Sequence, residues 1–436
     1  MNEPGMKSLI EKLYLTNRAF ITDDYDWCLD YINKEVLPFK IHKYPSGKQI
    51  WDSWVIPSKW IVEEAYIESK GSRILDFKDH PLHLISYSSP YKGHISREEL
   101  LNHLYFCPHS EEAIPFHFRL NYRPWESEWG FCASKKFVDS LDQEKYYVSI
   151  KTRFEDGYLK VAEHHLAGQG KETIVLAAHL DHAGMANDDL AGCVVGLHLM
   201  KRLANLENRR YSYKLLLAPE ILGTAAYLES NEEPSQDFKY AIFLEMLGND
   251  NRLALQKSFT GNTKLDEIAE YVLRTSCNEF KVEEFRESVG NDEIIFESPG
   301  YEIPTISIHR YPYAEYHTSL DNPAIISEER LRDSLDYLLK VTDILEKDFT
   351  PKRKFKGLIS VANPKYDLYI DPGQPALSGA NYQIARNLIK FKDGIFRYLD
   401  GDYSVFDIAQ KFELDFDFVH DYLTKFYEKG LIDIIY

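Results

Sequence analysis

The sequence predicts an α/β protein with a mostly parallel, mixed sheet flanked by helices. Between about residues 145 and 350, short apolar runs typical of buried strands alternate with segments of helical spacing. The strand-like runs are TIVLAAH (173–179), KLLLAP (214–219), YAIFLEML (240–247) and IPTISIH (303–309). Helical spacing begins near Leu190 and recurs over 265–277 and 327–349. We expect two further units, a small β-rich insert before this layer and a C-terminal winged helix after it.

The composition and spacing of residues change three times along the chain. Residues 1–43 carry helical spacing, and we assign them with residues 122–350 to the main α/β domain. Residues 44–121 are aromatic, contain short extended runs and are punctuated by Pro and Gly, which favours an inserted β-rich domain. Residues 351–381 are rich in Pro and Gly, so we expect a linker or a wrapping arm. Residues 382–436 show helix, short helix, helix and strand in order, as in a winged-helix domain.

Composition and charge exclude several classes of protein. The chain has 436 residues, of which 44% are apolar and 28% charged, an ordinary globular composition. No apolar run approaches the roughly 18 residues that a membrane-spanning helix needs, and the first residues lack the apolar core of a secretory signal. The net charge of −18 argues against nucleic acid and membranes as partners. The five cysteines are scattered and form no CxxC pattern, so we expect a cytoplasmic protein.

The predicted winged helix has the wrong charge for contacting DNA. It holds seven basic and ten acidic residues, a net charge of −3. The segment in the place of a recognition helix begins with Asp415 and Asp417, which would face a phosphate backbone. We therefore expect a structural or protein-docking role for this domain. The many Tyr and Phe residues of the chain are compatible with a homo-oligomer, although aromatic residues are more often simply core.

Residue types that bind metals follow the ends of the predicted strands. These residues are His179, Asp181, His182, Asp188, Glu220, Glu245 and His317. Because ligands bind where the carboxyl ends of parallel strands meet, we expect these side chains to converge. A single His or Asp at such a position is usually structural, for example as a helix N-cap. Glu245 differs, because it lies in an apolar strand and a buried carboxylate needs a partner or a cation.

The order of these residues matches a known family. The matching motifs are His179-x-Asp181, Asn187-Asp188-Asp189-Leu190-Ala191-Gly192, Glu220, Glu245 and Tyr316-His317-Thr318-Ser319-x-Asp321. The chain thus resembles zinc aminopeptidases of the co-catalytic metal type over about residues 145–350, which implies a zinc exopeptidase-like fold. The family pattern is HxD, NDxxSG, a Glu-Glu pair, an acidic strand end and a YHTxxD-like loop. The insert and the tail resemble a narrower bacterial group of aminopeptidase-like proteins, sometimes named polysaccharide-biosynthesis proteins.

The resemblance implies a role for each matching residue. His179 would be a metal ligand that Asp181 orients, and Asp188 would bridge two metals. Glu245 would bind the first metal and His317 the second. Imidazole and carboxylate ligands suit Zn²⁺, with one or two ions per chain. The zinc would activate a water for attack on a peptide carbonyl.

The sequence departs from the family pattern at two points. Where the family has two adjacent glutamates, one a general base and one a ligand, this chain has Pro219 followed by Glu220. Glu220 can therefore serve as base or as ligand, and we favour the catalytic role. His182 lies three residues after His179, in a loop shorter than is usual for the family, so either imidazole can bind the metal. The strand-end position favours His179.

The predicted activity is zinc-dependent hydrolysis of amide bonds, as by an aminopeptidase acting on small peptides or aminoacyl conjugates. The segment Asn291-Asp292-Glu293 stands where the family has a substrate pocket, which implies that Asp292 or Glu293 would receive the free α-ammonium of the substrate, although a solvated acidic turn explains the same residues equally well. Tyr316, beside His317, is a second candidate for contacting the substrate. Two alternatives remain open. The same fold could transfer or remove an acyl group on an amino-sugar or glycan precursor, or a peptidase scaffold that has lost its base could act as a binding module.

Overall fold

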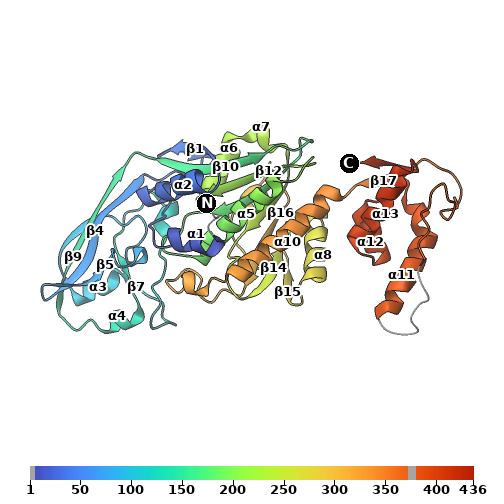
Figure 1. The fold of residues 1–436 in the computed structure, drawn as a ribbon. Helices are drawn as coiled ribbons and strands as arrows, with labels where there is room; N and C mark the ends of the chain where they lie inside the picture. The colour runs from blue at the N-terminus through green and yellow to red at the C-terminus, as the bar shows by residue number, and fades with distance from the viewer. Residues whose placement is uncertain (1–4, 372–379) are drawn as a thin grey trace. The chain divides into compact units, whose positions relative to one another are not determined.

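The chain folds as two compact units, Met1–Leu338 and Leu339–Tyr436. The computed structural model describes residues 5–371 and 380–436. Figure 1 shows the first unit as a sheet with helices packed against it, from the blue N-terminal helices to the orange helix α10 (Glu328–Lys347). Residues 372–379 of the predicted linker lie outside the described residues.

A central eight-stranded mixed sheet positions the candidate site. In order across the sheet, its strands are β1 (Lys40–Pro45), β10 (Tyr158–Leu166), β12 (Ser212–Ala218), β11 (Thr173–His179), β13 (Phe238–Leu244), β16 (Thr305–Tyr311), β14 (Arg252–Gln256) and β15 (Phe280–Glu283). Strands β12, β11, β13 and β16 are parallel, and β10 and β14 pair antiparallel with the edges of this parallel core. The predicted mixed α/β fold is confirmed.

Helices cover both faces of this sheet, because successive strand residues point to opposite faces and both faces are apolar. On one face, Ala177 and Phe243 share a core with α6 (Leu222–Ser230) and α9 (Glu293–Phe296). On the other face, Leu215 and Leu244 meet Gly196 of α5 (Gly192–Ala204). The other helices of this unit are α1 (Met6–Leu13), α2 (Asp23–Glu35), α7 (Glu232–Ser235) and α8 (Lys264–Ser276).

The region of the predicted insert contains a four-stranded antiparallel sheet of its own. Across this sheet the strands are β5 (Ser72–Asp76), β4 (Lys59–Ser69), β9 (Lys145–Glu155) and β6 (Tyr91–Ser96). Strand β9 comes after residue 121, so the sheet extends beyond the predicted end of the insert. The reason is the long register of β9 with β4, from Lys59 opposite Glu155 to Glu68 opposite Tyr147. The division of the first unit at residues 44 and 121 stays a prediction.

The insert and the α/β sheet share one apolar core. Trp60 and Phe131 belong to the same buried cluster as Ala177 and Phe243 of the central sheet. The smaller elements of this region are β2 (Gln49–Ile50), β3 (Trp54–Val55), α3 (Arg97–Asn102), β7 (Leu104–Tyr105), β8 (Phe131–Cys132) and α4 (Lys135–Asp139). A continuous core means that the insert cannot loosen without exposing apolar surface of the main sheet.

The second unit has the helix order that the sequence predicts. Its helices are α11 (Ala380–Gly394), α12 (Val405–Phe412) and α13 (Phe416–Glu428), and its strands β17 (Thr350–Arg353) and β18 (Ile432–Ile435) pair antiparallel. Strand β17 takes up the start of the predicted linker, because Thr350–Arg353 hydrogen-bonds along β18. The assignment of this unit as a winged helix stays a prediction.

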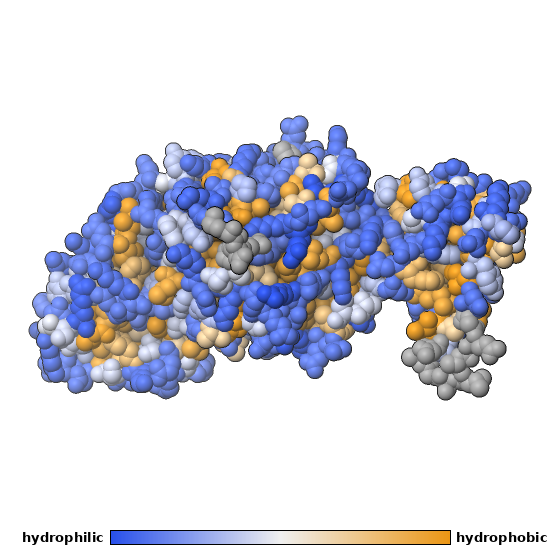
Figure 2. All heavy atoms as spheres, viewed as in Figure 1, coloured by the Kyte–Doolittle hydropathy of each residue, from blue (hydrophilic) through white to orange (hydrophobic). Residues whose placement is uncertain are grey.

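The surface is mostly polar on the visible face. Figure 2 shows hydrophilic residues spread over most of the first unit, with scattered apolar patches between them. Among the described residues, no helix combines the length and the apolar character needed to cross a membrane.

Gly192 is expected to be irreplaceable at the start of α5. A Cβ atom there would lie 2.4 Å from the carbonyl oxygen of Leu244 and 2.5 Å from Asp189 Oδ2. We expect Gly192→Ala to lower the free energy of unfolding by about 2–3 kcal/mol, because a strand carbonyl cannot rotate away. Urea denaturation measures this change. Gly93→Ala is the control, since its nearest atom is the Tyr91 hydroxyl at 3.4 Å, and equal losses in both variants would contradict the prediction.

Candidate metal centre

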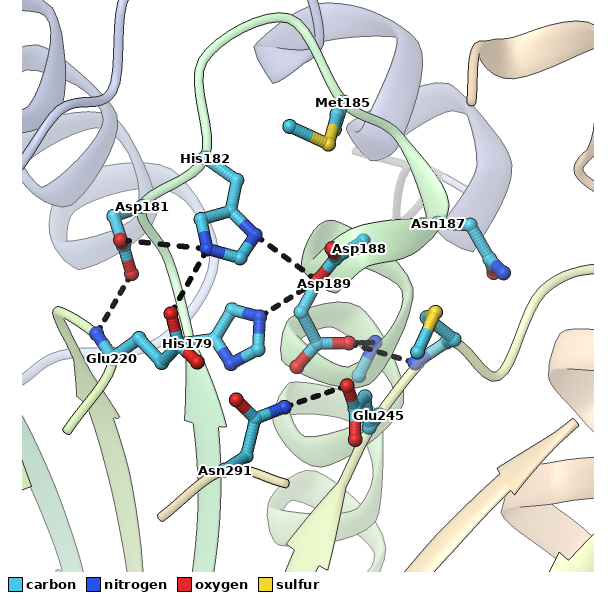
Figure 3. A network of polar contacts seen from close by, with 12 residues as sticks. His179, Asp181, His182, Met185, Asn187, Asp188, Asp189, Glu220, Glu245 and Asn291 are labelled. Carbon is cyan, nitrogen blue, oxygen red and sulfur yellow. Dashed lines mark hydrogen bonds and ion pairs between the residues drawn. The ribbon is translucent and has the colours of Figure 1, made fainter. Parts of the chain in front are cut away.

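Asp188 lies at the centre of a buried cluster of imidazoles. Its Oδ1 atom is 2.8 Å from His179 Nε2 and 3.1 Å from His182 Nδ1, and Figure 3 shows both rings directed at this carboxylate. Its Oδ2 atom is 3.2 Å from His317 Nε2. His179, His182 and Asp188 are all buried, and His317 is nearly so. The structure thus brings together residues from the end of β11, the following loop and the segment after β16.

Glu220 joins this cluster from the end of β12, and Asp181 lies beside it. Glu220 Oε2 is 3.3 Å from His182 Nε2 and accepts a hydrogen bond from the hydroxyl of Tyr122 at 2.8 Å. Asp181 Oδ1 accepts the backbone N–H of Glu220 at 2.8 Å, and its Oδ2 is 3.8 Å from His182 Nε2. The resemblance implied that Asp181 orients His179, whereas these contacts of Asp181 are with Glu220 and His182 (Figure 3).

His179 and His182, between which the sequence leaves the choice of metal ligand open, both lie in the cluster. The ligand atoms of His179, His182 and Asp188 lie within 4.8 Å of one another, and so do those of Asp181, His182 and Glu220. His182 is common to both groups. The short loop after β11 therefore does not force a choice between the two imidazoles, and each can offer a nitrogen to a metal.

Glu245 and Asp189 add two further buried carboxylates below Asp188 (Figure 3). Glu245 follows β13, and its Oε1 accepts a hydrogen bond from Asn291 Nδ2 at 2.6 Å. Asp189 Oδ1 accepts the backbone N–H groups of Gly192 and Met246, each at 3.0 Å. In both residues the second carboxylate oxygen has no hydrogen-bond partner among the described residues.

The electrostatics of the cluster favour positive charge. Burial alone would raise the pKa of Asp188, but the imidazoles of His182, His179 and His317 hold it well below its ordinary value. Burial acts to lower the pKa of His179, yet the hydrogen bond to Asp188 and the charge of Asp189 raise it to about 10. Burial, together with neighbouring carboxylates, raises the pKa of Glu245 well above its ordinary value. Such a group of buried carboxylates needs protons or a cation.

The donor atoms of this cluster fit a metal ion. Within the described part of the chain, several are buried and make no hydrogen bond. Four of these atoms have an ion-pair contact only: Asp181 Oδ2, His182 Nδ1, Asp188 Oδ2 and His317 Nε2. The other three are His179 Nδ1, Asp189 Oδ2 and Glu245 Oε2. Buried polar atoms without a hydrogen bond are uncommon in folded proteins, and seven of the 17 such atoms among the described residues belong to this one cluster. A mixture of imidazole nitrogen and carboxylate oxygen is the donor set that Zn²⁺ prefers.

Asp321 holds the backbone of the loop that carries Asp188. Its carboxylate accepts the N–H groups of Ala186, Asn187 and Asp188 at 3.2, 2.6 and 2.9 Å. The sequence places Asp321 in the last motif without indicating this role. Since it follows His317 by four residues, one segment both contacts Asp188 and fixes its backbone.

Arg18 holds the same loop from the other side, and sequence analysis missed it. The guanidinium is fully buried and donates to the carbonyl oxygens of Leu180, His182 and Met185 at 2.9, 2.7 and 2.8 Å. It also donates to the backbone of Leu13 at 2.6 Å. Nothing near Arg18 in the sequence signals this role, because its partners in the loop lie more than 160 residues away.

The two candidate substrate residues differ in accessibility. Asp292 is 1% exposed, its Oδ1 accepts the N–H of Ile221 at 2.6 Å, and burial raises its pKa to about 8. Tyr316 is 43% exposed, and its ring stacks on His317 with the centroids 3.8 Å apart. Tyr316 can meet a ligand from solvent, whereas Asp292 can be reached only from within the site.

Four of the thirteen described non-glycine residues with positive φ lie at the cluster. His182, Ile221, Met246 and His317 have φ values of +77°, +61°, +46° and +54°. Each is a candidate ligand or directly follows a candidate residue. Positive φ is uncommon outside glycine and is a genuine outlier for a β-branched residue such as Ile221. Strain of this kind tends to be retained at functional sites.

A search of sequence families identifies the chain. The family described as a domain of unknown function, DUF4910, matches residues 7–348. The chain belongs to the DUF4910 family. A relative of this DUF4910 protein in Clostridium acetobutylicum is 32% identical over 346 residues, which cover 79% of this chain and 78% of the relative. That protein is provisionally named as a polysaccharide biosynthesis protein with an aminopeptidase-like domain.

Solved structures share the fold of this DUF4910 chain. A protein of Clostridium acetobutylicum, provisionally described as a peptidase, is 28% identical and matches 99% of this chain and 96% of its own with a TM-score of 0.85. The zinc aminopeptidase BSAP of Bacillus subtilis is 14% identical and matches 78% of this chain and 94% of its own with a TM-score of 0.57. A peptidase M28 precursor of Shewanella amazonensis is 14% identical, with 78% and 92% coverage and a TM-score of 0.54. The α/β unit therefore has a zinc aminopeptidase fold.

Loss of the Arg18 guanidinium is expected to weaken both folding and metal binding. Arg18→Met would leave buried carbonyl oxygens of the loop without donors, so we expect a loss of about 3 kcal/mol or more in the free energy of unfolding. Because the loop carries candidate ligands, zinc affinity should fall about 10–100-fold. Urea denaturation and competition for zinc with a chromophoric chelator measure the two effects.

Arg310→Met is the matched control for this substitution. Arg310 is also buried and donates to backbone carbonyl oxygens, those of Leu247, Asn251 and Arg330. We expect a similar loss of stability with zinc affinity unchanged. Equal losses of zinc affinity in both variants would show that Arg18 acts through general stability alone.

Proposed function

We propose that this protein is a zinc-dependent hydrolase of amide bonds, an aminopeptidase that acts on small peptides or aminoacyl conjugates. The observation that carries the proposal is the concentration of buried imidazole nitrogen and carboxylate oxygen atoms around Asp188, several of which make no hydrogen bond. These atoms lie at the carboxyl ends of parallel strands, which is where α/β folds bind their ligands. The zinc aminopeptidase fold of the unit gives independent support.

His179, His182, Asp188, Glu245 and His317 are the proposed zinc ligands. Asp188 has imidazoles on both carboxylate oxygens, so it is suited to bridge two ions. His182 lies between Asp188 and Glu220 and offers a further nitrogen. Bound zinc would supply Lewis acidity, polarising a peptide carbonyl and making water a nucleophile near neutral pH. The number of ions, one or two, is part of the proposal.

Glu220 is the proposed proton acceptor. Burial acts to raise the pKa of Glu220, but the hydrogen bond and the charge of His182, with the hydroxyl of Tyr122, lower it below its ordinary value. The carboxylate is therefore ionised at neutral pH and can take a proton from the attacking water and pass it to the leaving amine. Asp181 would support this role, because it accepts the backbone N–H of Glu220.

Asp292 is proposed to receive the free α-ammonium of the substrate. It lies beside the turn that carries Glu220, through its hydrogen bond to Ile221. A buried carboxylate at that position would favour a cationic group, which an unblocked N-terminus supplies and an acylated one does not. Tyr316, partly exposed on His317, would contact the substrate from the solvent side. Release of single N-terminal residues would follow from this arrangement.

A second candidate function is the transfer or removal of an acyl group on an amino-sugar or glycan precursor. The name of the Clostridium acetobutylicum relative favours it, since that name refers to polysaccharide biosynthesis. The same zinc ligands and Glu220 would serve either reaction, because both attack a carbonyl attached to nitrogen. For residues 382–436, the excess of acidic over basic residues supports a protein-docking role in place of DNA binding, and we place the protein in the cytoplasm.

Asp188→Asn is expected to abolish zinc binding. Protein purified without chelator or metal-affinity tag should contain about one to two zinc ions per chain, and the variant should contain almost none, because the amide carries no charge to bind the cation. Elemental analysis measures the content. Asp266→Asn is the control, since Asp266 is equally buried but caps α8 far along the chain. Full zinc content in the Asp188 variant would refute the proposed centre.

Glu220→Gln is expected to remove activity but not metal. Turnover of dipeptides with a free N-terminus should fall by about 100-fold or more, because the amide cannot accept a proton, while zinc content stays constant. N-acetylated dipeptides should not be cleaved by the unmodified protein. Glu229→Gln serves as the control, since Glu229 pairs with Lys48 on the surface.

The outcomes separate the competing functions. Retained turnover in the Glu220 variant would exclude Glu220 as the base. Full zinc content without hydrolysis of any peptide would favour acyl transfer or deacylation. A protein that binds zinc poorly would favour the binding module.

A further inference from the structure

A segment of the insert is built into the wall of the candidate centre. The N–H of Phe116 donates to the carbonyl oxygen of His317 at 2.9 Å. Two positions away, Ile114 and Ser319 exchange hydrogen bonds in both directions, at 3.0 and 2.9 Å. The insert therefore pairs directly with the loop that presents His317, although about 200 residues separate the two segments.

Aromatic rings of the same segment cover the imidazoles. The ring of Phe116 meets His182 and His317 edge-on, with centroids 5.1 and 5.5 Å apart. The ring of Phe118 meets His317 at 5.1 Å. These contacts shield the imidazoles from water on the side of the insert and make this segment part of the site.

Tyr122 brings a hydroxyl group from this segment to Glu220. Its ring is held edge-on against Phe20 at 5.2 Å and against Trp54 at 6.4 Å. Its hydroxyl donates to Glu220 Oε2 at 2.8 Å, which is shorter than the 3.3 Å separation between that oxygen and His182 Nε2. Packing fixes the ring, so the hydroxyl offers Glu220 a donor whose position does not change.

We propose that Tyr122 is a positioning residue that holds the carboxylate of Glu220 in the orientation needed to accept a proton. The proposal rests on the proposed role of Glu220 as base. Glu220 follows Pro219, where the family has a second glutamate, so a single carboxylate must be oriented correctly. A hydrogen bond to one oxygen restrains rotation of the carboxylate and directs the other oxygen. The segment 114–122, which begins in the predicted insert and ends just after it, would thus be a working part of the active site.

A double-mutant cycle tests the contact without any assay of activity. It compares Tyr122→Phe, Glu220→Ala and the double variant with the unmodified protein by urea denaturation of the full chain. A hydrogen bond to a carboxylate should couple the two sites by about tenfold or more in the unfolding equilibrium. Coupling below about threefold would overturn the proposal, because Tyr122 would then exert no hold on Glu220.

Steady-state kinetics tests the positioning role. In Tyr122→Phe we expect kcat to fall about 10–100-fold while KM changes less than about twofold and zinc content is unchanged. Tyr87→Phe is the matched control. It removes a buried hydroxyl that accepts the N–H of Ile21 and makes no hydrogen bond to Glu220. Its kcat should match that of the unmodified protein.

The failures of the two proposals are distinguishable. A rise in KM at constant kcat, or equal losses in Tyr122→Phe and Tyr87→Phe, would overturn the positioning role while leaving the hydrolase intact. Strong coupling in the cycle together with no hydrolysis of any peptide by the zinc-loaded protein would refute the proposed function and, with it, the catalytic role of Tyr122.

Discussion

The arrangement of this protein depends on one buried carboxylate, that of Asp188. An anion that is 1% exposed is expensive unless charged or polar partners surround it. Here three imidazoles provide them, from the end of a central strand, from the loop after it and from a segment more than 120 residues later. Asp189 and Glu245 are buried beside Asp188, and each has a carboxylate oxygen that makes no hydrogen bond. The negative charge of the three carboxylates is therefore not fully balanced by the imidazoles. A metal ion would balance this excess better than protons can, because it would also satisfy the lone pairs that make no hydrogen bond.

The loop that carries Asp188 can be buried because two charged side chains, distant in the sequence, hydrogen-bond to its backbone N–H and C=O groups. A buried loop normally exposes N–H and C=O groups that nothing pairs. Asp321 accepts three of the N–H groups and Arg18 donates to three of the carbonyl groups. The carboxylate of Asp321 thus pairs with N–H groups of the loop, and the guanidinium of Arg18 pairs with its C=O groups. These hydrogen bonds hold a short loop rigid in place of the ladder of a regular helix or sheet. Rigidity of this kind presets ligand positions and reduces the cost of ordering them when a ligand binds.

Much of the fold and part of the site can be predicted from the sequence, for a specific reason. Strands such as 173–179 and 240–247 are apolar runs, and parallel topology places their polar ends together, so convergence of His179 and Glu245 follows from local pattern alone. Arg18 and Tyr122 could not be found in this way. Their partners lie 162 and 98 positions away, and a single Arg or Tyr in a mixed segment carries no periodic signal. The pairing of β9 with β4 could not be predicted either, because the two strands lie far apart in the sequence and no local pattern links them.

The backbone between Ala218 and Leu222 explains why one glutamate can stand where the family has two. Strand β12 ends at Ala218, and Pro219 cannot donate a further hydrogen bond to the sheet. Glu220 is then turned into the site, with its N–H on Asp181. Ile221 follows at a φ of +61°, a conformation that disfavours a β-branched residue by about 1–3 kcal/mol.

Two hydrogen bonds resist relaxation of that strain. The N–H of Ile221 is held by Asp292 at 2.6 Å, and the carboxylate of Glu220 is held by Tyr122 at 2.8 Å. A turn with no function would lose little by relaxing to an ordinary conformation. This turn stays strained, and the carboxylates of Asp292 and Glu220 are both held by hydrogen bonds. We expect such strain where the backbone presents Glu220 to a reacting group, and not where a turn merely ends a strand.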